Sequence, residues 1–170
     1  MSSIEMERET LYAQGKRLSI KSAVVGSVVF AFVDLAGVYV NTYIIQQIDT
    51  PDGIENIIFT AIWIIFVILL GSAFAYLPAR FLGGFLARLL HNDYEKHKLT
   101  IRIALIKGAL IGALASIVIC LPILLIQYNF IQQTGHGDFF VFIYRTIEAT
   151  VIASFAGARS GVQINKILAK

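Results

Sequence analysis

Four long apolar runs constrain the fold of this chain more than any other feature. They cover residues 22–45, 57–78, 103–126 and 139–160. Each run is about twenty residues long, so a helix at about 1.5 Å per residue reaches across a hydrocarbon core of roughly 30 Å. A bilayer interior offers backbone amides no partner outside a helix or a closed barrel, and these runs are too long and continuous for barrel strands. The sequence predicts an all-α integral membrane protein, a bundle of four transmembrane helices.

The Lys and Arg residues lie almost entirely on one side of these runs. Of the fourteen, only Arg145 breaks the pattern, and the connections at 46–56 and 127–138 contain none. Cytoplasmic segments of membrane proteins are enriched in Lys and Arg. We therefore expect both termini and the central 79–102 loop to be cytoplasmic, in an N-in/C-in arrangement, and the protein to lie in the cell (plasma) membrane.

The net charge of +3 hides a division between the two sides. The inner segments carry thirteen cations and five acids, a net charge of +8, whereas the outer connections carry −4. The basic balance thus reflects orientation in the membrane rather than nucleic-acid binding, and it favours anionic lipid headgroups at the cytoplasmic face. The residues expected to contact these headgroups are Arg80, Arg88, Arg102, Lys107, Arg159 and Lys166.

Composition points to one transmembrane domain covering residues 1–170. Hydrophobic residues make up 57% and charged residues 15%, with a mean hydropathy of +0.74, which is more apolar than a soluble domain of this size. The single cysteine, Cys120, excludes an intramolecular disulfide and C-x-x-C redox chemistry.

Two segments at the inner side are expected to be helical in part. Residues 1–20 have apolar positions spaced by sevens, which predicts an amphipathic helix on the inner leaflet, with disorder as the alternative. Pro78 closes the second run, and the helical spacing of basic residues after it predicts a kinked or broken helix near the headgroups. Residues 91–100 then form a solvent-exposed loop or a helix extension, and 161–170 form a cytoplasmic C-terminus.

A weak internal repeat is visible at the start of the first and third runs. Residues 21–27 and 107–113 share the order Lys, small, Ala, two aliphatic residues, Gly, small. Two parallel two-helix repeats would explain this similarity. Helix starts at an inner membrane surface also tend to share this pattern, so both explanations stay open.

Small residues recur at about four-residue spacing along the runs. Such faces allow helix backbones to approach closely in a bilayer. The spacing alone does not distinguish contacts within one chain from contacts between protomers. The residues expected to pack helices together are Gly71, Ala75, Ala79, Gly83, Gly108, Gly112, Ser116, Ala149, Ala153 and Gly157.

Three ionisable residues lie deep within the runs: Asp34, Arg145 and Glu148. Asp34 lies thirteen residues from Lys21 and Arg145 lies fourteen from Arg159, so both are about 20 Å from the inner end of their helix. Each charge would cost roughly 2.5–3.5 kcal/mol at the centre of an isolated span. We expect the first and fourth helices to be neighbours, with Arg145 bridging the two acids.

This cluster has several possible roles. It could fix helix register and do nothing more, or its surplus carboxylate could handle protons or cations. Contact with a partner helix, or an Arg145 side chain that reaches the outer interface, are further alternatives.

The remaining signals for a chemical site are weak. His91, Asp93 and His97 have no fourth metal ligand at a suitable spacing, so no metal site and no cofactor are expected. No nucleophile, zinc, phosphate-loop or dinucleotide motif is present. We therefore expect a non-enzymatic multi-pass protein, a structural or accessory component of a homo- or hetero-oligomeric membrane complex. A small transporter or channel using Asp34, Arg145 and Glu148 is the alternative.

Overall fold

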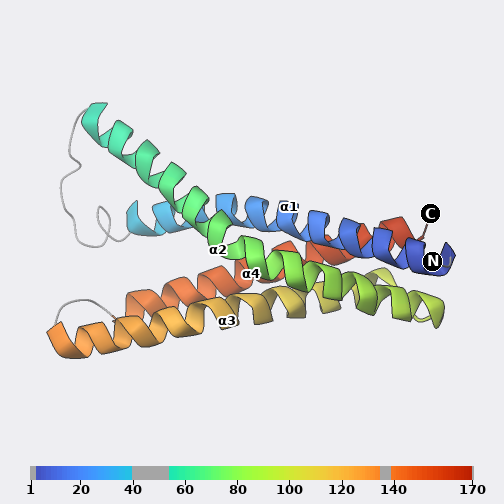
Figure 1. Cartoon of the computed structure of the whole chain (residues 1–170). Helices are drawn as coiled ribbons and strands as arrows, with labels where there is room; N and C mark the ends of the chain where they lie inside the picture. The colour runs from blue at the N-terminus through green and yellow to red at the C-terminus, as the bar shows by residue number, and fades with distance from the viewer. Residues whose placement is uncertain (1–2, 40–53, 135–138, 170) are drawn as a thin grey trace.

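The protein is an elongated bundle of helices. A computed structural model describes residues 3–39, 54–134 and 139–169, and it contains no strand in these ranges. Figure 1 shows that α1 begins and α4 ends at the same end of the bundle, where α2 also turns into α3. The all-helical prediction is confirmed for the described residues. The helices are α1 (Ser3–Tyr39), α2 (Ile54–Glu95), α3 (Ile101–Thr134) and α4 (Phe139–Leu168).

Three segments in the described residues are long and apolar enough to cross a membrane. They are Glu9–Gly37 in α1, Thr60–Glu95 in α2 and Ile101–Gln132 in α3. This supports the membrane protein that the sequence predicts. The fourth predicted span, 139–160, lies within the helix α4, which is not among the three. Four spans, and the side on which the termini lie, stay predictions.

The helices are longer than the predicted spans. With 37 and 42 residues, α1 and α2 measure about 55 Å and 63 Å, well beyond the thickness of a hydrocarbon core. Residues 3–20 therefore continue the first span as one helix instead of forming a separate stub. The second helix passes through Pro78 and stays helical to Glu95, which agrees with the helical spacing predicted after the proline and with a helix extension beyond residue 90. The cytoplasmic position of residues 79–102 stays a prediction. A proline removes one backbone hydrogen bond, and the helix beyond it is held by packing.

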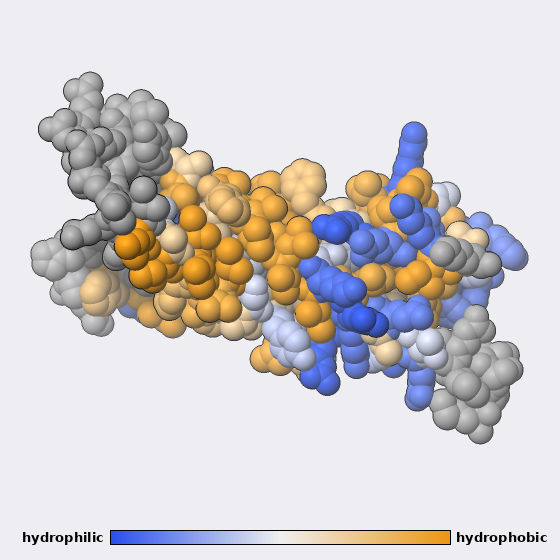
Figure 2. Space-filling view, turned by 90° about the horizontal axis from the view of Figure 1, so that it is seen from above, coloured by the Kyte–Doolittle hydropathy of each residue, from blue (hydrophilic) through white to orange (hydrophobic). Residues whose placement is uncertain are grey.

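A core of large apolar residues lies at the end where the termini meet. All four helices contribute to it, and several of its side chains are fully buried. On the face seen in Figure 2, hydrophilic residues gather over this end, while hydrophobic residues cover the middle of the bundle. The hydrophobic effect can act here, because these helix ends lie where water is expected. The buried core residues are Leu11, Leu86, Ala87, Leu90, Ala104 and Ile164.

Farther along the bundle, helices are joined through glycines. A Cβ atom at Gly108 in α3 would overlap the carbonyl oxygen of Gly157 in α4, and a Cβ at Gly157 would overlap that of Gly108. In the other pair, a Cβ at Gly83 in α2 would overlap Ser19 in α1. The predicted small-residue faces are thus used within one chain, where they bring α1 to α2 and α3 to α4.

The outer half of α2 departs from this arrangement. In Figure 1 its N-terminal half leans away from the other three helices. None of the residues described between Ile58 and Leu70 is buried, and both of these ends are more than 40% exposed. This segment is apolar on every side and has few neighbours in its own chain.

The α3–α4 contact yields a stability prediction. Gly157→Ala should lower the free energy of unfolding by about 1–3 kcal/mol, because the added methyl group meets backbone atoms that cannot move aside. Gly26→Ala is the matched control, since its Cβ would lie 3.5 Å from the Ala156 Cβ, an ordinary contact. Thermal unfolding in detergent should show a lower midpoint for Gly157→Ala alone. Equal midpoints for the two variants would contradict the close contact.

Candidate functional site

The intramembrane charges lie at the interface of α1 and α4. Arg145 Nε is 3.0 Å from Asp34 Oδ1, and the Asp34 side chain is only 7% exposed. The depth argument from the sequence had placed these residues at the same level of neighbouring helices, and the ion pair agrees with it. A charged pair with a short contact offsets part of the cost of burying each charge. The pair thereby joins the α1–α2 hairpin to the α3–α4 hairpin.

Small residues on α1 bring α4 close enough for this pair to form. Gly26 faces Ala156 and Ile152 of α4, and Gly37 faces the hydroxyl of Tyr144. These contacts lie on both sides of Asp34 along α1. The ion pair therefore lies between two ordinary van der Waals contacts of α1 with α4.

Glu148 does not join the pair as predicted. It is 9% exposed, and among the described residues neither of its carboxylate oxygens has a hydrogen-bond partner. The charges of both Asp34 and Arg145 nevertheless act on it. Arg145 pairs with Asp34 on α1, although Glu148 lies only three residues away on the same helix. The predicted three-way bridge is therefore wrong, and a buried carboxylate is left without a hydrogen-bond partner among the described residues.

A polar contact links α3 to α4 one turn farther along. The Thr150 hydroxyl donates to the carbonyl oxygen of Thr146 at 2.8 Å and lies 3.3 Å from Ser116 Oγ. Ser116 Oγ in turn lies 3.7 Å from the Cys120 sulfur. Such backbone partners keep hydroxyl groups satisfied within an apolar bundle. Ser116, predicted as a packing residue, is buried at this interface.

An apolar cavity of about 310 Å³ lies among the four helices. Several predicted packing residues line it, among them Ala75, Ala79 and Ala149. Cys120 also lines it, whereas Glu148 does not. The lining contains few polar groups, so this cavity suits an apolar occupant and offers no path of ion ligands.

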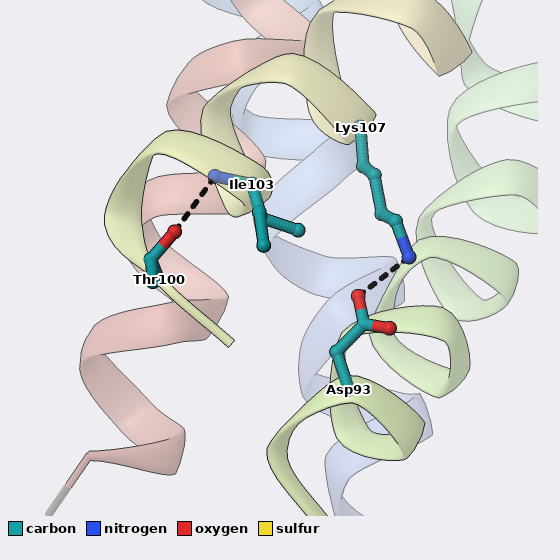
Figure 3. A network of polar contacts seen from close by, with 4 residues as sticks. All are labelled: Asp93, Thr100, Ile103 and Lys107. Atoms are coloured by element: carbon teal, nitrogen blue, oxygen red, sulfur yellow. Dashed lines mark hydrogen bonds and ion pairs between the residues drawn. The ribbon is translucent and has the colours of Figure 1, made fainter. Parts of the chain in front are cut away.

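The weak metal-ligand candidates lie near the α2–α3 turn and do not form one site. His91 Nε2 lies 3.1 Å from Glu95, and Asp93 pairs with Lys107 of α3 at 2.5 Å. Figure 3 shows this Asp93–Lys107 contact between α2 and α3. His97 is exposed. In the described ranges, no group of three potential ligands could hold a metal ion.

The α2–α3 turn is instead built from helix caps. Lys98 N donates to Asp93 O and His97 N donates to Tyr94 O, the paired bonds of a Schellman motif. His97 takes the left-handed position of this motif, with a φ of 54°, where glycine is usual. Ile103 N donates to Thr100 Oγ1 at 3.3 Å, so Thr100 caps the start of α3 (Figure 3).

The predicted headgroup contacts divide into two groups. Five are exposed, whereas Lys107 is half-buried and paired with Asp93, which limits its reach to a lipid. Of the exposed residues, Arg88 lies 4.4 Å from the ring of Tyr12, with Lys16 4.1 Å from the same ring. This cation–π stack was not predicted, although the four-residue spacing of Tyr12 and Lys16 indicates part of it. The exposed five are Arg80, Arg88, Arg102, Arg159 and Lys166.

Comparison with known protein families, curated proteins and solved structures gives no match to this chain.

The Asp34–Arg145 pair generates a stability prediction. Asp34→Asn should lower the free energy of unfolding by about 1–3 kcal/mol, because it leaves a partly buried guanidinium without its carboxylate. The double variant Asp34→Asn/Arg145→Gln should recover part of this loss. Denaturant or thermal unfolding in detergent measures both. A neutral Asp34→Asn that becomes destabilising only with Glu148→Gln would show that Arg145 turns to Glu148.

The α2–α3 turn generates a second prediction. His97→Gly should preserve or raise stability by up to about 1 kcal/mol, because glycine adopts a positive φ without steric strain. His97→Val should lower stability by about 1–2 kcal/mol, since a β-branched residue is strained there. Thermal midpoints in detergent should therefore rank glycine, histidine and valine in that order. The reverse order would contradict the left-handed cap.

Proposed function

We propose that this chain is a non-enzymatic, four-span membrane protein, with both termini cytoplasmic, that acts as a structural or accessory subunit of a membrane complex. The observation that supports this most directly is the outer half of α2. It is apolar on all sides, and none of its described residues between Ile58 and Leu70 is buried. A helix that is hydrophobic all round is suited to lipid or to the helices of another subunit.

The positions of the small residues indicate which surface such a partner would bind. Gly83, Gly108 and Gly157 are already in contact within the chain, so those faces are not free for another protomer. The outer half of α2 instead offers bulky side chains such as Trp63, Phe66 and Leu69. A second copy of this chain, or another membrane subunit, would bury them through side-chain packing rather than through backbone contact.

A small transporter is the second candidate, and one observation favours it. Glu148 is a buried carboxylate without a hydrogen-bond partner among the described residues. Ionisable groups at membrane depth commonly mark ion or proton sites. The apolar lining of the nearby cavity weighs against a hydrated ion path.

Native mass spectrometry after gentle detergent extraction tests the subunit role. We expect the chain in a fixed complex, either with copies of itself or with other subunits. Leu69→Ala on α2 should weaken the complex roughly tenfold if it lies at the interface. Leu114→Ala on α3 is the control of similar exposure. A monomer under all conditions would contradict the subunit role and favour transport.

A further inference from the structure

The buried carboxylate of Glu148 is the feature that the fold leaves unexplained. Its residue is 9% exposed, and both oxygens are enclosed without a hydrogen-bond partner in the described part of the chain. The hydroxyl groups of Thr146 and Ser154 on the same helix are occupied by carbonyl oxygens one turn earlier. An ionised carboxylate in such surroundings is unfavourable unless something neutralises it.

The surrounding charges do not neutralise Glu148 directly. On α1, Asp34 adds a second negative charge, and on α4 Arg145 is already paired with it. On α2, no charged residue occurs between Glu55 and Arg80, and on α3 none occurs between Lys107 and Thr134. Within these stretches the uncharged titratable groups are Tyr76 on α2 and Cys120 and Tyr128 on α3, while α1 ends in Tyr39 and α4 carries Tyr144. The cluster therefore holds two acids and one base.

A proton fits this site better than a metal ion. An alkali or divalent cation needs several oxygen ligands. The described residues contain no group of three potential ligands, and backbone carbonyls are bonded within their own helices. A proton needs only one carboxylate oxygen, and it removes the surplus negative charge.

We propose that Glu148 is a proton-binding site within the membrane. With its proton, Glu148 is a neutral neighbour of the Asp34–Arg145 pair. Without it, Glu148 competes with Asp34 for Arg145, which lies three residues away on the same helix. The proton thereby determines whether Arg145 joins α4 to α1. This site does not depend on which of the two proposed functions the chain performs.

Infrared spectroscopy of the purified full-length protein tests the site. A protonated carboxyl group has a carbonyl stretch that is separate from the carboxylate stretches. At neutral pH the wild-type protein should show this band, and Glu148→Gln should lose it. The other five glutamates lie near or outside the predicted membrane boundaries. Equal spectra for wild type and Glu148→Gln would overturn the proposal.

Isotope labelling makes the test independent of any variant. In wild-type protein with ¹³C in its glutamate carboxyl groups, the band should shift to lower frequency, and ¹³C-aspartate should leave it in place. Raising the pH should remove the band. No band at neutral pH, or a band that moves only with ¹³C-aspartate, would overturn the proposal. Loss of the band on replacing choline chloride with sodium chloride at constant pH would show a sodium site instead.

Discussion

Close backbone contact at glycine is the constraint on which the arrangement of these helices depends. In a bilayer, apolar side chains gain little by leaving lipid, so helices associate through van der Waals contact where their backbones come together. Gly108 and Gly157 make such a contact between α3 and α4, and Gly83 does so against α1. These contacts hold α1 against α2 and α3 against α4, without any contribution from contacts between the two hairpins. The Asp34–Arg145 pair then joins the α1–α2 hairpin to the α3–α4 hairpin.

Packing changes along the bundle because its surroundings change. At the end where the termini meet, Leu86, Leu90 and Ile164 form a core of large side chains. There the hydrophobic effect stabilises burial, as in a soluble helical bundle. Farther along, glycine and alanine replace these residues at the helix contacts. This change explains why α1 and α2 extend beyond a membrane thickness without fraying, since their extensions have a core of their own.

The sequence predicts correctly those features that depend only on the position of a residue along its helix. Counting residues from Lys21 and Arg159 placed Asp34 and Arg145 at one depth, and the structure pairs them. The prediction failed at Glu148, because depth does not say which of the two acids Arg145 contacts, and Glu148 has no hydrogen-bond partner among the described residues. The sequence also left open whether the helix would break at Pro78 or continue through it. Pro78 acts on one turn, whereas the burial of Leu86 and Leu90, which keeps α2 helical, depends on residues distant in sequence.

The helix α1 connects the site to the rest of the bundle. It packs against α2 through Gly15 and Gly83, and it meets α4 at Gly26 and Asp34. The cavity lies among the four helices, so the angle between the two hairpins sets its width. Two ion pairs join the hairpins, Asp93–Lys107 near the α2–α3 turn and Asp34–Arg145 farther along, so a change in the partner of Arg145 alters one of the two. A single proton at Glu148 is therefore placed where it can influence both the α1–α4 contact and the cavity beside it.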